Sequence, residues 1–168
     1  LVTQAAAMLS AAERPLLYLG GGVVHSGASA QAVELAEKAS LPTVMTLMAL
    51  GGMPVDHPLS LGMLGMHGAR CTNFALDECD LLIVVGARFD DRATGKVAAF
   101  CPQAKIIHID IDPSELDKIK TAHIGIQGDV AAVLAELAPQ VKANLRETWL
   151  GRIAELKSAH PLRMPGIN

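Results

Sequence analysis

The sequence predicts an α/β fold: a doubly wound, mainly parallel sheet of five or six strands with helices on both faces, Rossmann-like in architecture. Apolar runs of strand length alternate along the chain with segments whose apolar residues recur at helical spacing. These runs are continuously apolar, which is typical of parallel strands covered on both faces. The length of 168 residues suits one such domain.

The composition excludes several classes of protein. A hydrophobic fraction of 51% is too high for a disordered chain, and a net charge of -3 gives no general attraction to nucleic acid or anionic membranes. No apolar run approaches the ~20 residues that span a bilayer, and we see no signal peptide. The three cysteines lack C-x-x-C spacing. We therefore expect reduced thiols in a cytoplasmic protein that binds neither nucleic acid nor membrane.

The first half of the chain predicts two helices and two strands before a long loop. Residues 3–15 form a helix that Pro15 ends, and residues 16–19 form a buried strand that leads into three glycines. Residues 27–40 form a second helix, and a second strand opens at Pro42 and ends near Thr46 or Leu47. Residues 51–68, rich in glycine and methionine, predict an ordered loop of functional length.

The second half predicts three further strands. A helix over 69–79 leads into the strand DLLIVVGAR at 80–88, and an irregular or helical connection leads to KIIHIDID at 105–112. A short strand at 123–129 precedes a helix over 130–145, in which Pro139 marks a kink or a break. A last helix is expected over 149–160.

The ends of the chain suggest a domain excised from a longer protein. The first residue is Leu1, and the last nine residues, HPLRMPGIN, resemble a linker. We expect a central domain over residues 1–146, followed by a C-terminal helix and linker over 147–168 that lead to a domain absent from this chain.

The ligand site is predicted at the carboxyl edge of the sheet, where doubly wound folds bind ligands at the reversal of strand order. The stretch DLLIVVGARFDDR places four charges in five positions where a core strand ends. The residues that follow the five predicted strands are Gly20, Gly21 and Gly22; Thr46, Leu47 and Met48; Gly86, Ala87 and Arg88; Asp110 and Asp112; and Gly128 and Asp129.

The chemistry of these strand ends predicts a nucleotide cradle. Glycines let backbone approach a ligand, and their free N–H groups can donate to phosphate oxygens. Arg88 and Arg92 offer forks of donors to phosphate, and Asp110 accepts from ribose hydroxyls. Other interpretations stay open: the glycines form a turn, the arginines pair with neighbouring acids, and Asp112 and Asp129 cap helices.

Several motifs of catalysis are missing. The GGGVVHSG stretch lacks G-x-G-x-x-G spacing, and neither the Walker spacing nor a G-x-S-x-G elbow occurs. His67 has the ordinary explanation of a loop histidine, and the other five histidines show no metal-ligand spacing. We therefore assign no catalytic and no metal-binding residue to this chain.

Six strings taken in order carry a family resemblance: RPLLYLGGGV, LPTVMTLMALG, HPLSLGMLGMHG, DLLIVVGARFDDR, KIIHIDIDPSELDK and IQGDV. Together they resemble the central domain of the acetohydroxyacid synthase (acetolactate synthase) catalytic subunit, over about residues 3–145. The resemblance implies FAD in this domain, without net redox duty. It also implies thiamine diphosphate and magnesium in an enzyme that joins pyruvate to a second 2-keto acid for branched-chain amino-acid synthesis.

The resemblance also implies which residues contact FAD. Gly20, Gly21 and Gly22 would approach its ADP half, and Thr46, Leu47 and Met48 its flavin side. Leu64, Gly65, Met66 and His67 match the family's loop along the cofactor. Gly86, Ala87, Arg88, Asp90 and Arg92 would hold the ribityl and phosphate region, with Asp110, Ile111 and Asp129 around the adenosine.

The parts of the family that this chain lacks set the rival hypotheses. The family's G-D-G metal signature is absent, since the G-D here is Gly128-Asp129-Val130, and its catalytic glutamate belongs to another domain. Implied partners are flanking domains, further copies in a dimer or tetramer, and a regulatory small subunit. The alternatives are a flavin-free spacer domain of another thiamine diphosphate enzyme and a freestanding NAD- or NADP-binding module, which the missing fingerprint opposes.

Overall fold

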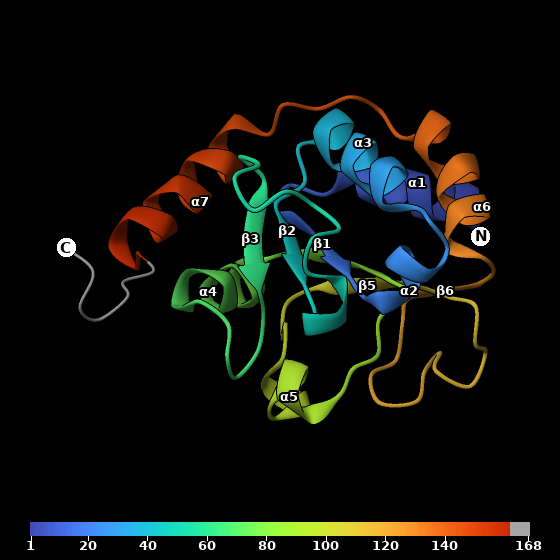
Figure 1. The fold of residues 1–168 in the computed structure, drawn as a ribbon. Helices are drawn as coiled ribbons and strands as arrows, with labels where there is room; N and C mark the ends of the chain where they lie inside the picture. Colours follow the sequence, from blue (N-terminus) through green and yellow to red (C-terminus); the bar gives the residue numbers. More distant parts are fainter. Residues whose placement is uncertain (162–168) are drawn as a thin grey trace.

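The computed structural model describes residues 1–161 and contains one sheet of six parallel strands in the order β3-β2-β1-β4-β5-β6 (Figure 1). The strands are β1 (Pro15–Leu19), β2 (Thr43–Met45), β3 (Ser60–Met63), β4 (Leu81–Val85), β5 (Lys105–Asp110) and β6 (Ile124–Gln127). The predicted doubly wound α/β architecture, with six strands, is confirmed.

Helices cover both faces of this sheet. The α-helices are α1 (Val2–Ala11), α2 (Gly21–His25), α3 (Ser29–Ala39), α4 (Arg70–Glu78), α5 (Asp91–Thr94), α6 (Val130–Leu137) and α7 (Glu147–Ala159). Short 3-10 turns occupy η1 (Leu47–Ala49), η2 (Val97–Ala99) and η3 (Ala138–Gln140). Figure 1 shows α1, α3 and α6 on one side of the sheet and α4 and α7 on the other. No helix within residues 1–161 has the length and apolar character needed to cross a bilayer.

The core divides at the sheet because successive strand residues face opposite sides. In β1, Leu17 and Leu19 pack with α1, α3 and α6, whereas Leu16 and Tyr18 pack with α4 and α7. All five residues of β1 and of β4 are buried, which explains why their sequences are continuously apolar.

Four predicted segments need correction. Helix α1 ends at Ala11, and Pro15 opens β1 instead of ending the helix, since a proline is tolerated as the first residue of a strand. The three glycines lead directly into the short helix α2, where we predicted only a turn. The helix predicted over 130–145 ends at Leu137, and Pro139 lies in the 3-10 turn η3 that follows.

The fourth correction is an edge strand inside the segment predicted to be a loop. β3 has four residues and pairs with one neighbour, with Leu64 N donating to Met45 O at 3.2 Å. Its Gly62 has φ +68°, and the register with β2 shifts between Thr43 and Met45. So short a strand with a glycine bulge lacks the apolar run that marks the other strands.

Helix α7 closes the second face of the core. Trp149, Ile153 and Leu156 are buried there against α4, and the Trp149 indole N–H donates to Pro15 O at 2.9 Å. The predicted last helix is therefore present. Of the predicted linker HPLRMPGIN, residues 162–168 lie outside the described residues.

Arg146, directly before α7, forms hydrogen bonds with the C-terminal ends of α1 and α3, on the opposite face of the sheet from α7. It is buried and donates to the carbonyls of Leu9 at 2.7 Å and Ala12 at 3.1 Å, at the end of α1, and to the carbonyl of Ala39, the last residue of α3. Burial lowers the pKa of its guanidinium, while the three carbonyls accept from three of its five N–H donors, one from each nitrogen.

The segments that follow β1 and β4 touch backbone to backbone. A Cβ added at Gly20 would lie 2.3 Å from Gly86 O, and one added at Gly22 would lie 2.8 Å from Gly86 Cα. Gly86 itself has φ +59°, the left-handed region that favours glycine. Glycine is therefore required on both sides of this contact.

We predict that Gly20→Ala lowers the free energy of unfolding by about 1–3 kcal/mol, because the new methyl group overpacks rigid backbone. Gly151→Ala is the control: it sits in α7, and a methyl group added there would meet no atom within 4 Å. That change should raise the free energy of unfolding by about 0.5–1 kcal/mol. Chemical denaturation measures both, and equal effects would contradict the close approach at Gly20.

An ion pair between α4 and α7 should make stability depend on pH. Arg152 donates to both carboxylate oxygens of Glu78, at 2.6 and 2.8 Å, which lowers the pKa of Glu78 from its ordinary 4.5. A lowered pKa in the folded state stabilises the fold above the unfolded value, and this is lost as pH falls through the folded value. Both side chains are partly exposed, so solvent screens the pair and Arg152→Gln should lower stability only slightly at neutral pH. Denaturation curves of wild type and variant should converge as the pH falls through the lowered folded-state pKa of Glu78.

Candidate functional site

Two adjoining hollows lie along the carboxyl edge of the sheet, each of about 460 Å³. They share Gly22, His25, Gly86 and Arg88, so they form one continuous crevice. The crevice opens above β1 and β4, where the strand order reverses between the β3-β2-β1 half and the β4-β5-β6 half. This is the edge at which we predicted a ligand site.

Most of the predicted site residues line this crevice. In the first hollow are Gly21, Gly22, Thr46, Leu47, Met48, Leu64, His67, Gly86, Ala87, Arg88, Asp90 and Arg92. The second hollow adds Asp110, Ile111 and Asp129. The fold thus brings together residues from the ends of all six strands. Their contact with a cofactor stays a prediction.

Three predicted residues lie away from the crevice. Gly20 packs beneath it against Gly86. Gly65 and Met66 line a different hollow of about 390 Å³, because their loop turns back over α5, with Met66 N donating to Arg92 O at 3.0 Å. Asn73 holds this turn by exchanging two hydrogen bonds of 3.0 Å with the backbone of Gly65.

The expected role of the glycine N–H groups also needs correction. Gly20 N donates to Val85 O at 2.9 Å, and Gly22 N donates to Gly86 O at 3.0 Å. Both N–H groups therefore already donate to backbone carbonyls and are not free to bind phosphate. At these two positions glycine serves the backbone contact that brings β1 and β4 to the same crevice.

The sequence analysis missed six residues that line the crevice. They are His25, Ser26, Met63, Ala93, Glu115 and Val130, whereas Asp112, named above as a strand-end residue, also lines it. Met63 ends β3, so recognition of that strand would have identified it by the same strand-end rule. His25 ends α2, and its position follows only once a helix is recognised directly after Gly20.

Two exposed arginines give the first hollow its positive charge. Within residues 1–161, neither Arg88 nor Arg92 forms an ion pair, which answers the alternative that they pair with neighbouring acids. Asp90 instead caps α5, with its Oδ1 accepting from Ala93 N at 3.0 Å. Unpaired guanidinium groups at a crevice are suited to a phosphate-bearing ligand.

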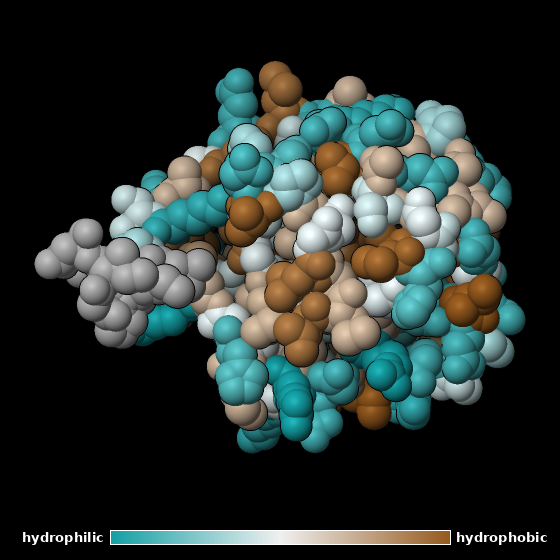
Figure 2. Space-filling view, viewed as in Figure 1, coloured by the Kyte–Doolittle hydropathy of each residue, from teal (hydrophilic) through white to brown (hydrophobic). Residues whose placement is uncertain are grey.

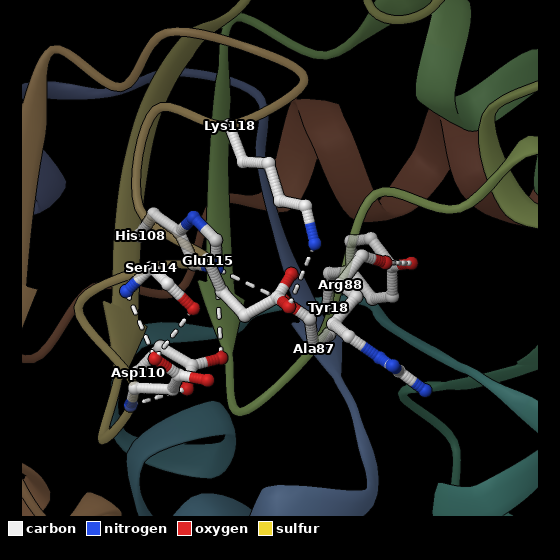
Figure 3. A network of polar contacts seen from close by, with 9 residues as sticks. Tyr18, Ala87, Arg88, His108, Asp110, Ser114, Glu115 and Lys118 are labelled. Atoms are coloured by element: carbon white, nitrogen blue, oxygen red, sulfur yellow. Dashed lines mark hydrogen bonds and ion pairs between the residues drawn. The ribbon is translucent and has the colours of Figure 1, made fainter.

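Carboxylates line the second hollow. Asp110 Oδ1 accepts from Asp112 N at 3.0 Å, and Asp112 in turn accepts from the N–H and hydroxyl of Ser114, which lowers its pKa (Figure 3). Glu115 pairs with Lys118 at 3.2 Å. Asp129 caps α6 by accepting from Ala132 N at 3.1 Å, whereas Asp112 caps a turn and no helix. Such a hollow suits the hydroxyl groups of a sugar.

Apolar and unsatisfied groups complete the first hollow. Leu47 and Met48 are about 70% and 69% exposed, and Figure 2 shows apolar surface in the middle of the face that carries the ends of β1 and β2. The Thr46 hydroxyl is buried without a partner among the described residues. A ligand with an apolar ring system and polar edges fits these features. Residues 1–161 contain no cluster of three or more histidine, cysteine, aspartate or glutamate side chains arranged to hold a metal ion.

The family model for the central domain of thiamine pyrophosphate enzymes matches residues 2–137. The chain belongs to this family. It is 61% identical over 164 residues to the acetolactate synthase isozyme 1 large subunit of Escherichia coli K12, covering 98% of this chain and 29% of that protein. It is 50% identical over 159 residues to a probable acetolactate synthase large subunit of Methanocaldococcus jannaschii, covering 93% and 27%.

These comparisons confirm the family resemblance seen in the six strings. A third relative, the acetolactate synthase isozyme 2 large subunit of Escherichia coli K12, is 46% identical over 163 residues, covering 96% of this chain. The chain spans less than a third of the length of these relatives. The family's central-domain match ends before α7, which the structure shows packed on α4.

The burial of Tyr18 gives a spectroscopic prediction. Tyr18 is the single tyrosine, and burial, followed by the Asp90 carboxylate and Cys101, raises its pKa well above the ordinary value. We expect no tyrosinate absorbance in the folded protein at about pH 10, where an exposed phenol is half ionised. The unfolded protein should titrate normally. A folded-state transition near that pH would show that Tyr18 is not enclosed.

Proposed function

We propose that this chain is the central domain of an acetolactate synthase large subunit and that its crevice binds FAD. The observation that carries the proposal is a crevice at the reversal of strand order, with two unpaired arginines, one of them at the junction of its two hollows, and a group of carboxylates in the second hollow. Identity of 61% to an acetolactate synthase large subunit supports the choice of enzyme.

The residues of the crevice fit the parts of FAD. Arg88 and Arg92 are free to bind the pyrophosphate, and Asp110 and its neighbours accept from ribose hydroxyls. Leu47 and Met48 offer apolar surface to the flavin ring. The two hollows, of about 460 Å³ each, have the size of ordinary ligand pockets. When bound, the flavin would have a structural role without net redox duty, and this chain's residues would bind and orient it.

The whole enzyme would join pyruvate to a second 2-keto acid in branched-chain amino-acid synthesis. Thiamine diphosphate and magnesium would be bound by domains that flank this one, and the chain itself would contribute cofactor binding and domain contacts. We also propose that the enzyme is cytoplasmic and assembles as a dimer or tetramer, with a regulatory small subunit as a further partner.

A second candidate function is a flavin-free spacer that contributes domain and subunit contacts. It is favoured by the hydrogen bonds that the Gly20 and Gly22 N–H groups donate to backbone carbonyls. These bonds and the close backbone contact explain why glycine occupies both positions without any ligand. The two unpaired arginines favour the flavin, since a spacer has no need for uncompensated charge at a crevice.

Titration with FAD, followed by flavin fluorescence, separates the two. Saturable binding that ADP displaces and NAD does not would support the flavin site. Absence of binding by this chain together with a flavin-free full-length enzyme would support the spacer. The full-length protein is needed for that arm, because flanking domains complete some sites.

Arg88→Ala should weaken FAD binding by about 1.5–3 kcal/mol, because it removes charge-assisted hydrogen bonds to phosphate. Lys105→Ala is the matched control: it removes one positive charge at the amino end of β5, on the opposite edge of the sheet. The control should leave the affinity unchanged. Equal affinity of wild type and Arg88→Ala would remove Arg88 from the site.

A further inference from the structure

Arg88 is the exposed residue of a short segment in which the residues before and after it are buried. Ala87 and Phe89 are 3% and 4% exposed, while Arg88 between them is exposed at the junction of the two hollows. The segment directly follows Gly86, whose left-handed backbone turns the chain out of β4. The direction of Arg88 therefore depends on how the backbone of residues 87–89 is held.

The sheet places two polar side chains on either side of this segment. Tyr18 of β1 pairs with Val84 of β4, and Val84 pairs with His108 of β5. The three residues form one row across the sheet, so their side chains face the same side. Tyr18 and His108 thus flank the path that β4 takes as it ends, as Figure 3 shows for the two rings.

Each of these side chains binds one carbonyl of the segment. The Tyr18 hydroxyl donates to Arg88 O at 3.3 Å, and His108 Nε2 lies 2.9 Å from Ala87 O. A carbonyl only accepts, so Nε2 carries the hydrogen and donates. The Phe89 ring meets both rings edge to face, with centroids 6.2 Å from Tyr18 and 5.2 Å from His108.

Ordinary packing does not call for polar groups at these two positions. Tyr18 and His108 are completely buried, and a phenylalanine and a leucine would fill similar space without burying polar atoms. His108 Nδ1 is buried without a partner among the described residues, and Asp110 Oδ2 lies 3.9 Å from Nε2. The two polar side chains therefore serve to bind the carbonyls of Ala87 and Arg88.

We infer that Tyr18 and His108 are positioning residues for Arg88, and that affinity for the ligand's phosphate depends on them although neither lines the crevice. Two donors on two consecutive carbonyls leave the segment one orientation, which presents the guanidinium to both hollows. This inference rests on the proposed function, because it takes FAD as the phosphate-bearing ligand.

A double-mutant cycle tests the inference. Tyr18→Phe removes one hydroxyl, and FAD affinity should fall about threefold to tenfold, as for loss of a neutral hydrogen bond. In an Arg88→Ala background the same substitution should change the affinity by less than about twofold, because the group that it positions is gone. Equilibrium FAD titrations of the four proteins give the coupling.

His108 gives an independent arm. His108→Leu should weaken FAD binding at least as much as Tyr18→Phe, and His108→Gln should recover most of the affinity, because its amide N–H replaces the donor. Ile107→Val is the matched control, a fully buried change on the same strand that faces α1, α3 and α6. It should lower stability without changing affinity.

The outcomes separate the inference from the function on which it rests. If wild type binds FAD and Tyr18→Phe lowers FAD affinity equally with and without Arg88, Tyr18 and His108 serve packing alone. The inference is then wrong. If Arg88→Ala has no effect, the inference fails while FAD binding stands. If wild-type full-length enzyme binds no FAD, the proposed function fails and takes the inference with it.

Discussion

The backbone contact between the segments that follow β1 and β4 is the constraint on which the crevice depends. Gly20 and Gly22 meet Gly86 at distances that leave no room for a Cβ, and their N–H groups bind carbonyls across the same contact. This contact holds the two halves of the sheet's edge together where their connections leave in opposite directions. Without it, the two hollows would not share a wall.

The charges of the crevice follow from the same geometry. Because all six strands are parallel, residues that follow each strand gather at one edge, whatever their separation in sequence. The end of β4 contributes Arg88 and Arg92, while the ends of β5 and β6 contribute Asp110 and Asp129. Arg92 thus lies in the first hollow, Arg88 at the junction of the two, and most of the carboxylates in the second, as a ligand with a phosphate centre and a sugar requires.

In and beneath the crevice, polar side chains have local partners that fix loop backbone. Asp90 and Asp129 cap helices, Asn73 holds the turn at Gly65, and Tyr18 and His108 hold the carbonyls beside Arg88. Each of these hydrogen bonds joins a side chain to backbone close to where the chain places it, although His108 Nδ1 has no partner among the described residues. They let loops at the edge of the sheet present charged side chains in fixed directions.

The sequence by itself determined the fold class, the edge of the sheet that forms the site, and most of the crevice's lining residues, because parallel strands buried on both faces leave continuous apolar runs whose ends can be identified. Only the tertiary structure decided the rest. β3 is too short and glycine-broken to show a pattern, and the folding of the Gly65–Met66 turn away from the crevice depends on Asn73. The row of Tyr18, Val84 and His108 joins residues far apart in the sequence through strand register, which no local spacing encodes.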